Sequence, residues 1–114
     1  MSDNFTTLEA FKLLDIRAGT IIRTELFTEA RNPSFKVWVN LGAELGIRKS
    51  SARITGNYNA RELEGRQVIC IVNLPPKQIG PFMSEILILG FKDENGEIVL
   101  AVPQIAVPDG AYLH

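Results

Sequence analysis

Two short apolar runs joined by a stiff loop constrain the fold of this chain more than any other feature. Residues 68–74 are rich in β-branched side chains, and residues 86–89 are equally apolar. Short apolar runs bounded by proline and glycine are typical of strands buried on both faces. Between the runs, Pro75 and Pro76 restrict the backbone and fix the direction in which Lys77 projects. The loop is therefore either a tight connection between core strands or a rigid frame for polar side chains.

The composition describes one packed domain. The chain has 114 residues, 46% of them hydrophobic, which is enough for a single core and too apolar for a disordered chain. No apolar run reaches the length of a membrane span, and the first residues lack the layout of a signal peptide. The lone cysteine, Cys70, has no partner for an internal disulfide, which favours a reducing compartment. We expect one domain over residues 1–114, working in the cytoplasm without membrane insertion.

Charge is distributed unevenly along the chain, although the net charge is only −1. From residue 31 to residue 77 there are eight basic and three acidic residues, a balance of +5, and the rest of the chain carries −6. A basic segment within an acidic frame is suited to a polyanion or an acidic ligand. Solubilising charge that clusters by chance is the alternative. The basic residues of this segment are Arg31, Lys36, Arg48, Lys49, Arg53, Arg61, Arg66 and Lys77.

The N-terminal residues predict a short helix from about Thr7 to Leu13. Thr6 and Glu9 have the spacing of a capping box, and apolar residues recur every three positions on one helical face. Those apolar residues are Phe5, Leu8, Phe11 and Leu14. A helix this short is unstable alone, so we expect it to dock on the end of a barrel or on a second subunit.

Two segments in the first half predict strands. Residues 15–27 form a long one, and Gly19 within it indicates a bulge or a sharp bend. By alternation, one face of this strand carries Ile16, Ala18, Thr20, Ile22 and Leu26. Residues 35–41 alternate more regularly than any other segment. We expect their apolar set to face the core, namely Phe35, Val37, Val39 and Leu41.

The polar faces of two strands offer candidate contacts. Trp38 falls on the face opposite the core, beside Lys36, and tryptophan is enriched at interaction surfaces. Cover of this ring by the chain itself is the alternative. Residues 48–55 predict a third strand with Lys49, Ser51 and Arg53 on one face. A basic strand face can contact phosphates or carboxylates.

The remaining segments complete an OB-fold pattern. Residues 58–64 predict a helix ending at Gly65, and Asn95-Gly96 predicts the turn of a hairpin that returns along residues 98–102. A helix between the third and fourth of five strands is the OB-fold layout. We therefore predict an all-β fold, a five-stranded OB-fold barrel with a short N-terminal helix, a helix between strands 3 and 4, and a C-terminal extension.

The sequence contains no recognisable catalytic or metal-binding motif. The lone histidine, His114, is the last residue, so a nucleophile pair cannot be assembled around it with any support. Cys70 lies between Ile69 and Ile71 in a predicted core strand, which favours an inert buried thiol. There is no cluster of metal ligands and no glycine-rich phosphate loop. We expect a protein that is not an enzyme and that uses no cofactor or metal.

Four segments in order along the chain resemble a known family. They are residues 14–21, 49–55, 72–77 and 84–90. The chain resembles the CsaA family, small bacterial chaperones linked to protein secretion. That family belongs to the wider tRNA-binding-domain group, which includes the C-terminal domain of bacterial methionyl-tRNA synthetase. In the last segment Ser84 is retained, whereas Ile86 and Leu87 replace the Gly and Met of the tRNA-binding group, as in the CsaA pattern.

The resemblance implies a homodimer that binds unfolded or precursor polypeptides without ATP or catalysis. For polypeptide contacts we single out Trp38, Asn73, Lys77, Phe82, Ser84 and Glu85. Binding of tRNA or another structured RNA is the alternative function. For RNA contacts we single out Lys36, Arg48, Lys49, Arg53, Lys77 and Ser84.

Overall fold

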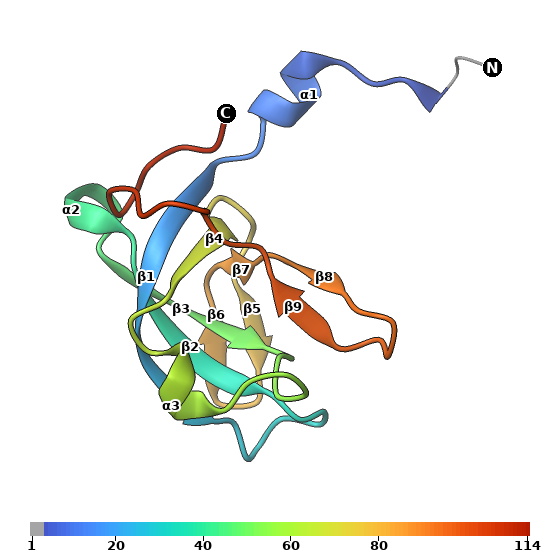
Figure 1. Ribbon diagram of the computed structural model, residues 1–114, viewed down its shortest axis with the longest axis vertical. Helices are drawn as coiled ribbons and strands as arrows, with labels where there is room; N and C mark the ends of the chain where they lie inside the picture. Colours follow the sequence, from blue (N-terminus) through green and yellow to red (C-terminus); the bar gives the residue numbers. More distant parts are fainter. Residues whose placement is uncertain (1–3) are drawn as a thin grey trace.

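The body of the protein is a five-stranded antiparallel sheet that curls into a nearly closed barrel (Figure 1). The structure is a computed structural model that describes residues 4–114. The sheet has the order β3-β2-β1-β4-β7. Its strands are β1 (Ile16–Leu26), β2 (Phe35–Asn40), β3 (Ile47–Ala52), β4 (Gln67–Ile71) and β7 (Leu87–Ile88). The predicted all-β, OB-type barrel is confirmed.

The core lies where alternation in β2 predicts it. Phe35, Val37, Val39 and Leu41 are all buried, as expected, and they pack with apolar residues from every other strand of the sheet. The short helix α3 (Ala60–Leu63), between β3 and β4, contributes the buried Leu63 to this core. Asn59 and Glu62 form a capping box that starts α3, and Gly65 follows it with φ 92°.

Strand β1 changes face part-way along. Its pairing with β2 shifts register between Ile21 and Arg23, which marks a β-bulge. Before that point Ile16 and Ala18 pair with Ile71 and Ile69, on the face opposite the buried Val68 and Cys70. Beyond it Leu26 pairs with Phe35, on the core face of β2, so the expectation that Leu26 shares a face with Ile16 is wrong. Ile22 lies at the bulge itself and is 45% exposed. Gly19 lies against β2 so closely that an added Cβ would sit 2.5 Å from Val39 Cγ1, so a larger residue there would displace core side chains.

The two apolar runs are not buried on both faces, which corrects that expectation. In β4, Val68 and Cys70 are fully buried, whereas Ile69 and Ile71, which alternate with them, are half-buried. Leu87 in β7 is 46% exposed. The physical reason is that an antiparallel barrel strand faces the core on one side only. Apolar side chains of the second run are thus left on the outside, where they contribute to a candidate site.

Two hairpins extend from the sheet. The loop predicted after Pro75-Pro76 contains one of them, β5 (Lys77–Ile79) paired with β6 (Phe82–Ser84). The other pairs β8 (Gly90–Lys92) with β9 (Ile98–Leu100) and turns at Gly96, φ 81°, as the Asn95-Gly96 pair predicts. The helix α2 (Gly42–Leu45) connects β2 to β3.

The N-terminal helix α1 (Leu8–Lys12) projects from the barrel near the C-terminus (Figure 1). Its N-cap is Thr7, which accepts a hydrogen bond from the Ala10 N–H, so the predicted cap at Thr6 is wrong by one residue. None of the helix residues is buried, and Phe5 before it is 84% exposed. Within the described part of the chain no helix is both long and apolar enough to span a membrane.

Candidate functional site

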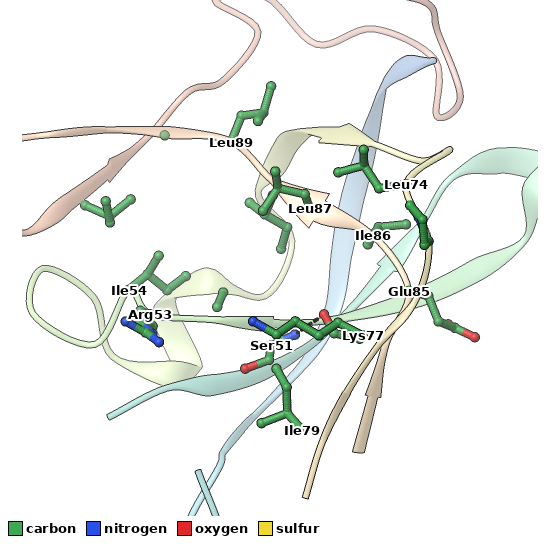
Figure 2. A pocket seen from close by; sticks show the side chains of 16 residues that line it. Ser51, Arg53, Ile54, Leu74, Lys77, Ile79, Glu85, Ile86, Leu87 and Leu89 are labelled. Atoms are coloured by element: carbon green, nitrogen blue, oxygen red, sulfur yellow. Dashed lines mark hydrogen bonds between the residues drawn. The ribbon is translucent and has the colours of Figure 1, made fainter. Parts of the chain in front are cut away.

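A groove follows the edge of β3 that is not paired with β2, and it consists of two adjoining hollows. The larger, about 570 Å³, lies between β3 and β7 beside the β5–β6 hairpin (Figure 2). The smaller, about 410 Å³, lies between residues 30–34, the end of β3 and β5. Both hollows are lined by Ser51, Arg53, Lys77 and Ile79. We call the two together the β3 groove.

The larger hollow forms an apolar half. Aliphatic side chains from three parts of the chain line it, namely Ile54, Leu74, Ile86, Leu87, Ile88, Leu89 and Ile98. Leu87 stands at its surface because β7 turns only alternate side chains toward the core. Such a surface can accept the apolar side chains of another chain, since burying apolar area is favourable.

The smaller hollow forms a basic half. Arg31 comes from the β1–β2 loop, Arg53 from the end of β3 and Lys77 from β5. Figure 2 shows Lys77 lying across β3, with Arg53 just beyond the end of that strand. None of the three forms a salt bridge within residues 4–114, whereas Lys36 pairs with Glu29 at 3.9 Å. OB-folds bind their ligands between the corresponding strands and loops, so this half has both the charge and the position of a binding surface.

Ser84 and Glu85 line the groove but also hold the barrel together. The Ser51 N–H donates to Ser84 Oγ at 3.0 Å, and the Lys49 N–H donates to Glu85 Oε1 at 3.0 Å. The Glu85 N–H in turn donates to the Lys49 carbonyl at 2.8 Å. These bonds use backbone groups of β3 that would otherwise pair with a neighbouring strand. Both side chains therefore fix the β5–β6 hairpin beside the groove.

Trp38 and Phe82 lie outside the groove in an aromatic cluster. Their ring centroids are 6.0 Å apart with an edge-on geometry, and Phe27 contacts Phe82 at 5.3 Å. Phe82 is only 6% exposed, so it is not available as a surface contact in this conformation. Trp38 is half-buried, and Arg23 lies 4.7 Å above its ring. Cover by the chain itself therefore accounts for much of the burial of Trp38.

The remaining predicted residues are placed in three different surroundings. Lys36 and Lys49 flank Phe82, at 5.5 and 5.6 Å from its ring. Arg48 points elsewhere and donates to the Leu45 carbonyl at 3.3 Å. Asn73 joins α1 to the barrel, because its amide accepts from the Asp15 N–H and donates to the Leu13 carbonyl, both at 2.9 Å. Of the predicted residues, the groove brings together Arg53, Lys77, Ser84 and Glu85.

Several groove residues were not singled out as contacts by sequence reasoning, although Arg31 was counted in the basic segment. They are Arg31, Leu74, Ile79, Leu89 and Ile98. Only the folded hairpins bring these residues to β3, and nothing in their spacing indicates it. Arg31 could have been found, because the loop between the first two OB-fold strands commonly contacts the ligand.

Cys70 and the acidic residues provide no second site. Burial raises the pKa of the Cys70 thiol to about 12, which fits the predicted inert thiol. Among residues 4–114, no group of three or more His, Cys, Asp or Glu side chains is placed to hold a metal ion.

Comparison with known proteins identifies the family. The sequence profile described as "Putative tRNA binding domain" matches residues 16–111. The chain belongs to this tRNA-binding-domain family. It is 34% identical over 105 residues to the methionine–tRNA ligase of Porphyromonas gingivalis and 34% identical over 102 residues to that of Methanothrix thermoacetophila. These matches cover 92% and 90% of the chain but span only 15% and 14% of the length of these curated relatives.

Solved structures of CsaA chaperones are similar over the whole chain. The chaperone CsaA of Bacillus anthracis is 41% identical, with a TM-score of 0.90, and the match covers 96% of this chain and 99% of that one. The CsaA chaperone protein of Picrophilus torridus is 37% identical, with a TM-score of 0.91 and coverage of 96% and 100%. The resemblance stated from the sequence is thereby confirmed. The family profile thus describes a tRNA-binding domain, and the similar solved structures are chaperones.

Proposed function

We propose that this protein is a chaperone that binds unfolded or precursor polypeptides along the β3 groove, without ATP or catalysis. The whole-length similarity to two CsaA chaperones supports the proposal. The observation that carries it is the open apolar half of the groove, which is lined by aliphatic side chains and bordered by the basic half. We place its action in the cytoplasm, on polypeptides awaiting export.

The mechanism follows from what an unfolded chain exposes. Aggregation begins when apolar segments of such chains meet one another. A rigid apolar groove competes with that self-association by burying some of the same area, at roughly 25 cal/mol per Å². The two hollows, about 570 and 410 Å³, hold only a short segment, so we expect the contact to be weak and reversible, which lets the client leave again.

We also propose that the protein acts as a homodimer. The N-terminal arm, residues 4–14, projects beside the C-terminus (Figure 1). Its apolar residues Phe5, Leu8 and Leu13 are exposed, and so is Leu113 at the C-terminus. A second copy of the chain would cover this surface. A dimer carries two β3 grooves on one body, and two weak sites hold an extended chain more tightly than one through effective concentration.

Binding of tRNA is the second candidate function. Arg31, Arg53 and Lys77 gather on the face that OB-folds use for oligonucleotides, and the family profile itself concerns tRNA binding. Against it stands Ile86, which is 5% exposed and packs into the core at the position where the tRNA-binding group has glycine. The side chain that replaces this glycine is therefore part of the hydrophobic core.

A side-by-side titration tests the two functions. A denatured precursor protein and a tRNA are each titrated at about 50 mM and 200 mM salt, the range over which phosphate-driven binding weakens steeply. We expect polypeptide binding to change little with salt and tRNA binding to fall by orders of magnitude. Tight tRNA binding at the higher salt, together with no polypeptide binding, would replace the chaperone with the RNA-binding function.

A further inference from the structure

We infer that the β3 groove binds a client segment as an added β-strand beside the end of β3, pairing at Arg53 beyond the part of the edge that Ser84 and Glu85 occupy, with an acidic residue of the client at this end. The inference rests on the proposed function and specifies which segment of a client is held and by which atoms. It follows from the backbone groups left open at the end of the β3 edge, from the alternation of the groove side chains and from the charge of the groove.

The first step is the direction of the β3 backbone. The N–H groups of Lys49 and Ser51 point away from β2, because they donate to Glu85 and Ser84 instead. Side-chain burial continues the same alternation, since Ala52 and Ile54 are buried whereas Arg53 is exposed. The N–H of Arg53 thus lies on the edge turned away from β2, and within residues 4–114 it has no hydrogen-bond partner.

The second step is the facing edge. Leu89 donates its N–H to Ile69 of β4, so the N–H and carbonyl of Ile88 point the other way, toward β3. In the described part of the chain, one backbone hydrogen bond joins β3 to the segment leading into β7, and it is the bond between Glu85 and Lys49. Beyond that bond the two edges line the larger hollow without pairing. The edges of β3 and β7 are therefore joined near Lys49 and Glu85 and are separate from there toward Arg53.

The third step is the chemistry of the occupant. An extended chain on the β3 edge turns alternate side chains toward the apolar half, where Leu74 and Leu87 stand. At the other end it meets Arg31, Arg53 and Lys77, which have no acidic partner within residues 4–114. Figure 2 shows Glu85 directed away from the Arg53 end, so the basic charge there is not neutralised. An acidic residue flanking an apolar strand complements this surface.

The lining of the groove favours a polypeptide over a nucleic acid. Single-stranded nucleic acids bind OB-folds by stacking bases on aromatic side chains. No aromatic ring lines either hollow among residues 4–114, since Trp38 and Phe82 lie in the separate cluster. Backbone pairing with a strand edge needs no particular client sequence, which suits a chaperone, and the side-chain hollows add a preference.

Peptides methylated on backbone nitrogen test the pairing. The probe is a seven-residue peptide of alternating valine and threonine that ends in two aspartates. One version carries N-methyl groups on the odd amides and another on the even amides, because only one set can face β3. We expect one version to lose about tenfold or more in affinity for the full-length protein and the other to lose little. Equal affinity of both versions and the parent peptide would overturn the added strand.

Charge reversal tests the acidic flank with a matched control. Arg53→Glu should weaken binding of the aspartate peptide about tenfold and improve binding of a version ending in two lysines. Arg48→Glu, on the same strand but directed away from the groove, should change neither. The same change in both variants would contradict the assignment of the acidic residue to the Arg53 end.

The outcomes separate this inference from the function on which it rests. If the protein suppresses client aggregation but ignores backbone methylation, the chaperone function stands and the added strand is wrong. If it neither suppresses aggregation nor binds any peptide, the function itself fails. If a single-stranded RNA oligonucleotide displaces the peptide and binds more tightly in 200 mM salt, the groove is a nucleic-acid site and the inference is overturned.

Discussion

At the residue scale, Arg17 joins three parts of the chain that are distant in sequence. The residue is 4% exposed, and its guanidinium donates to Asp15 and Glu44 at 2.8 and 2.9 Å and to the Tyr112 hydroxyl at 2.7 Å. The Tyr112 ring also lies 3.9 Å from it. The hydrogen bond with Asp15, more than the one with Glu44, raises the pKa of Arg17 and keeps it charged. This network fastens the C-terminal extension, residues 101–114, to β1.

Replacing Arg17 should loosen that extension. Arg17→Met leaves two carboxylates and a hydroxyl without their donor, and we expect a loss of about 2 kcal/mol in unfolding free energy, or roughly 8 °C in Tm. Tyr112→Phe removes one hydrogen bond and should cost about half as much. Thermal unfolding of the two variants measures this. An Arg17→Met variant as stable as the wild type would show that the network does not hold the extension.

Cys70 gives a prediction for alkaline pH. Its pKa is raised from the ordinary 9.0 to about 12 by burial, so the folded state retains a proton that the unfolded state releases above pH 9. Stability from this group is therefore complete below pH 9 and is lost as pH rises toward 12. At pH 10 we expect a loss of about 1.4 kcal/mol relative to pH 8. Urea unfolding of the wild type and Cys70→Ala isolates this term. Equal pH slopes in the two proteins would refute it.

At the element scale, the β5–β6 hairpin is the frame of the groove. Phe82 anchors it on the outer face of the sheet, and Ser84 and Glu85 tie its end to the edge of β3. The resemblance drew attention to Ser84 and Glu85 as contact residues. Their hydrogen bonds indicate that they position the hairpin, whatever else they contact.

Substitution of Glu85 separates these roles. Glu85→Ala removes the acceptor for the Lys49 N–H and should cost about 1–2 kcal/mol in unfolding free energy, with weaker client binding because the hairpin shifts. Glu85→Gln keeps an oxygen acceptor and should restore both stability and binding. If Glu85→Gln binds clients as poorly as Glu85→Ala while remaining stable, the carboxylate contacts the client directly.

Much of the fold could be predicted from local pattern, and little of the groove could. The alternation of residues 35–41 places four side chains in the core, because a half-buried strand repeats every two residues. The same rule fails after Ile21, where a bulge offsets the face of β1. The groove combines Arg31, Leu74 and Ile98, which no periodicity relates and which only the folded hairpins bring together.

At the scale of the whole molecule, the N-terminal arm is a part of the chain that does not pack against the barrel. Helix α1 is capped and apolar, yet none of its residues is buried. Exposed apolar surface of this kind usually marks an interaction site. A second copy of the chain as its occupant accounts for both the arm and the exposed C-terminal residues beside it.

Deletion of residues 1–13 tests that assembly. We expect the full-length chain to sediment as a dimer and the truncated chain to dissociate, since the arm supplies the apolar area that the second copy covers. Sedimentation at several protein concentrations measures the shift. A truncated chain that forms an equally stable dimer would remove the arm from the interface.

The central claim is that the β3 groove holds unfolded polypeptides. Its most direct test is light scattering from a client protein that aggregates on heating, with this protein at a one-to-one ratio and no nucleotide. We expect the wild type to slow aggregation and Leu87→Asp, which places a charge in the apolar half, to lose most of that effect. Leu26→Asp puts the same charge on an exposed position outside the groove and should act like the wild type. Aggregation at the same rate with and without the wild-type protein would contradict the account.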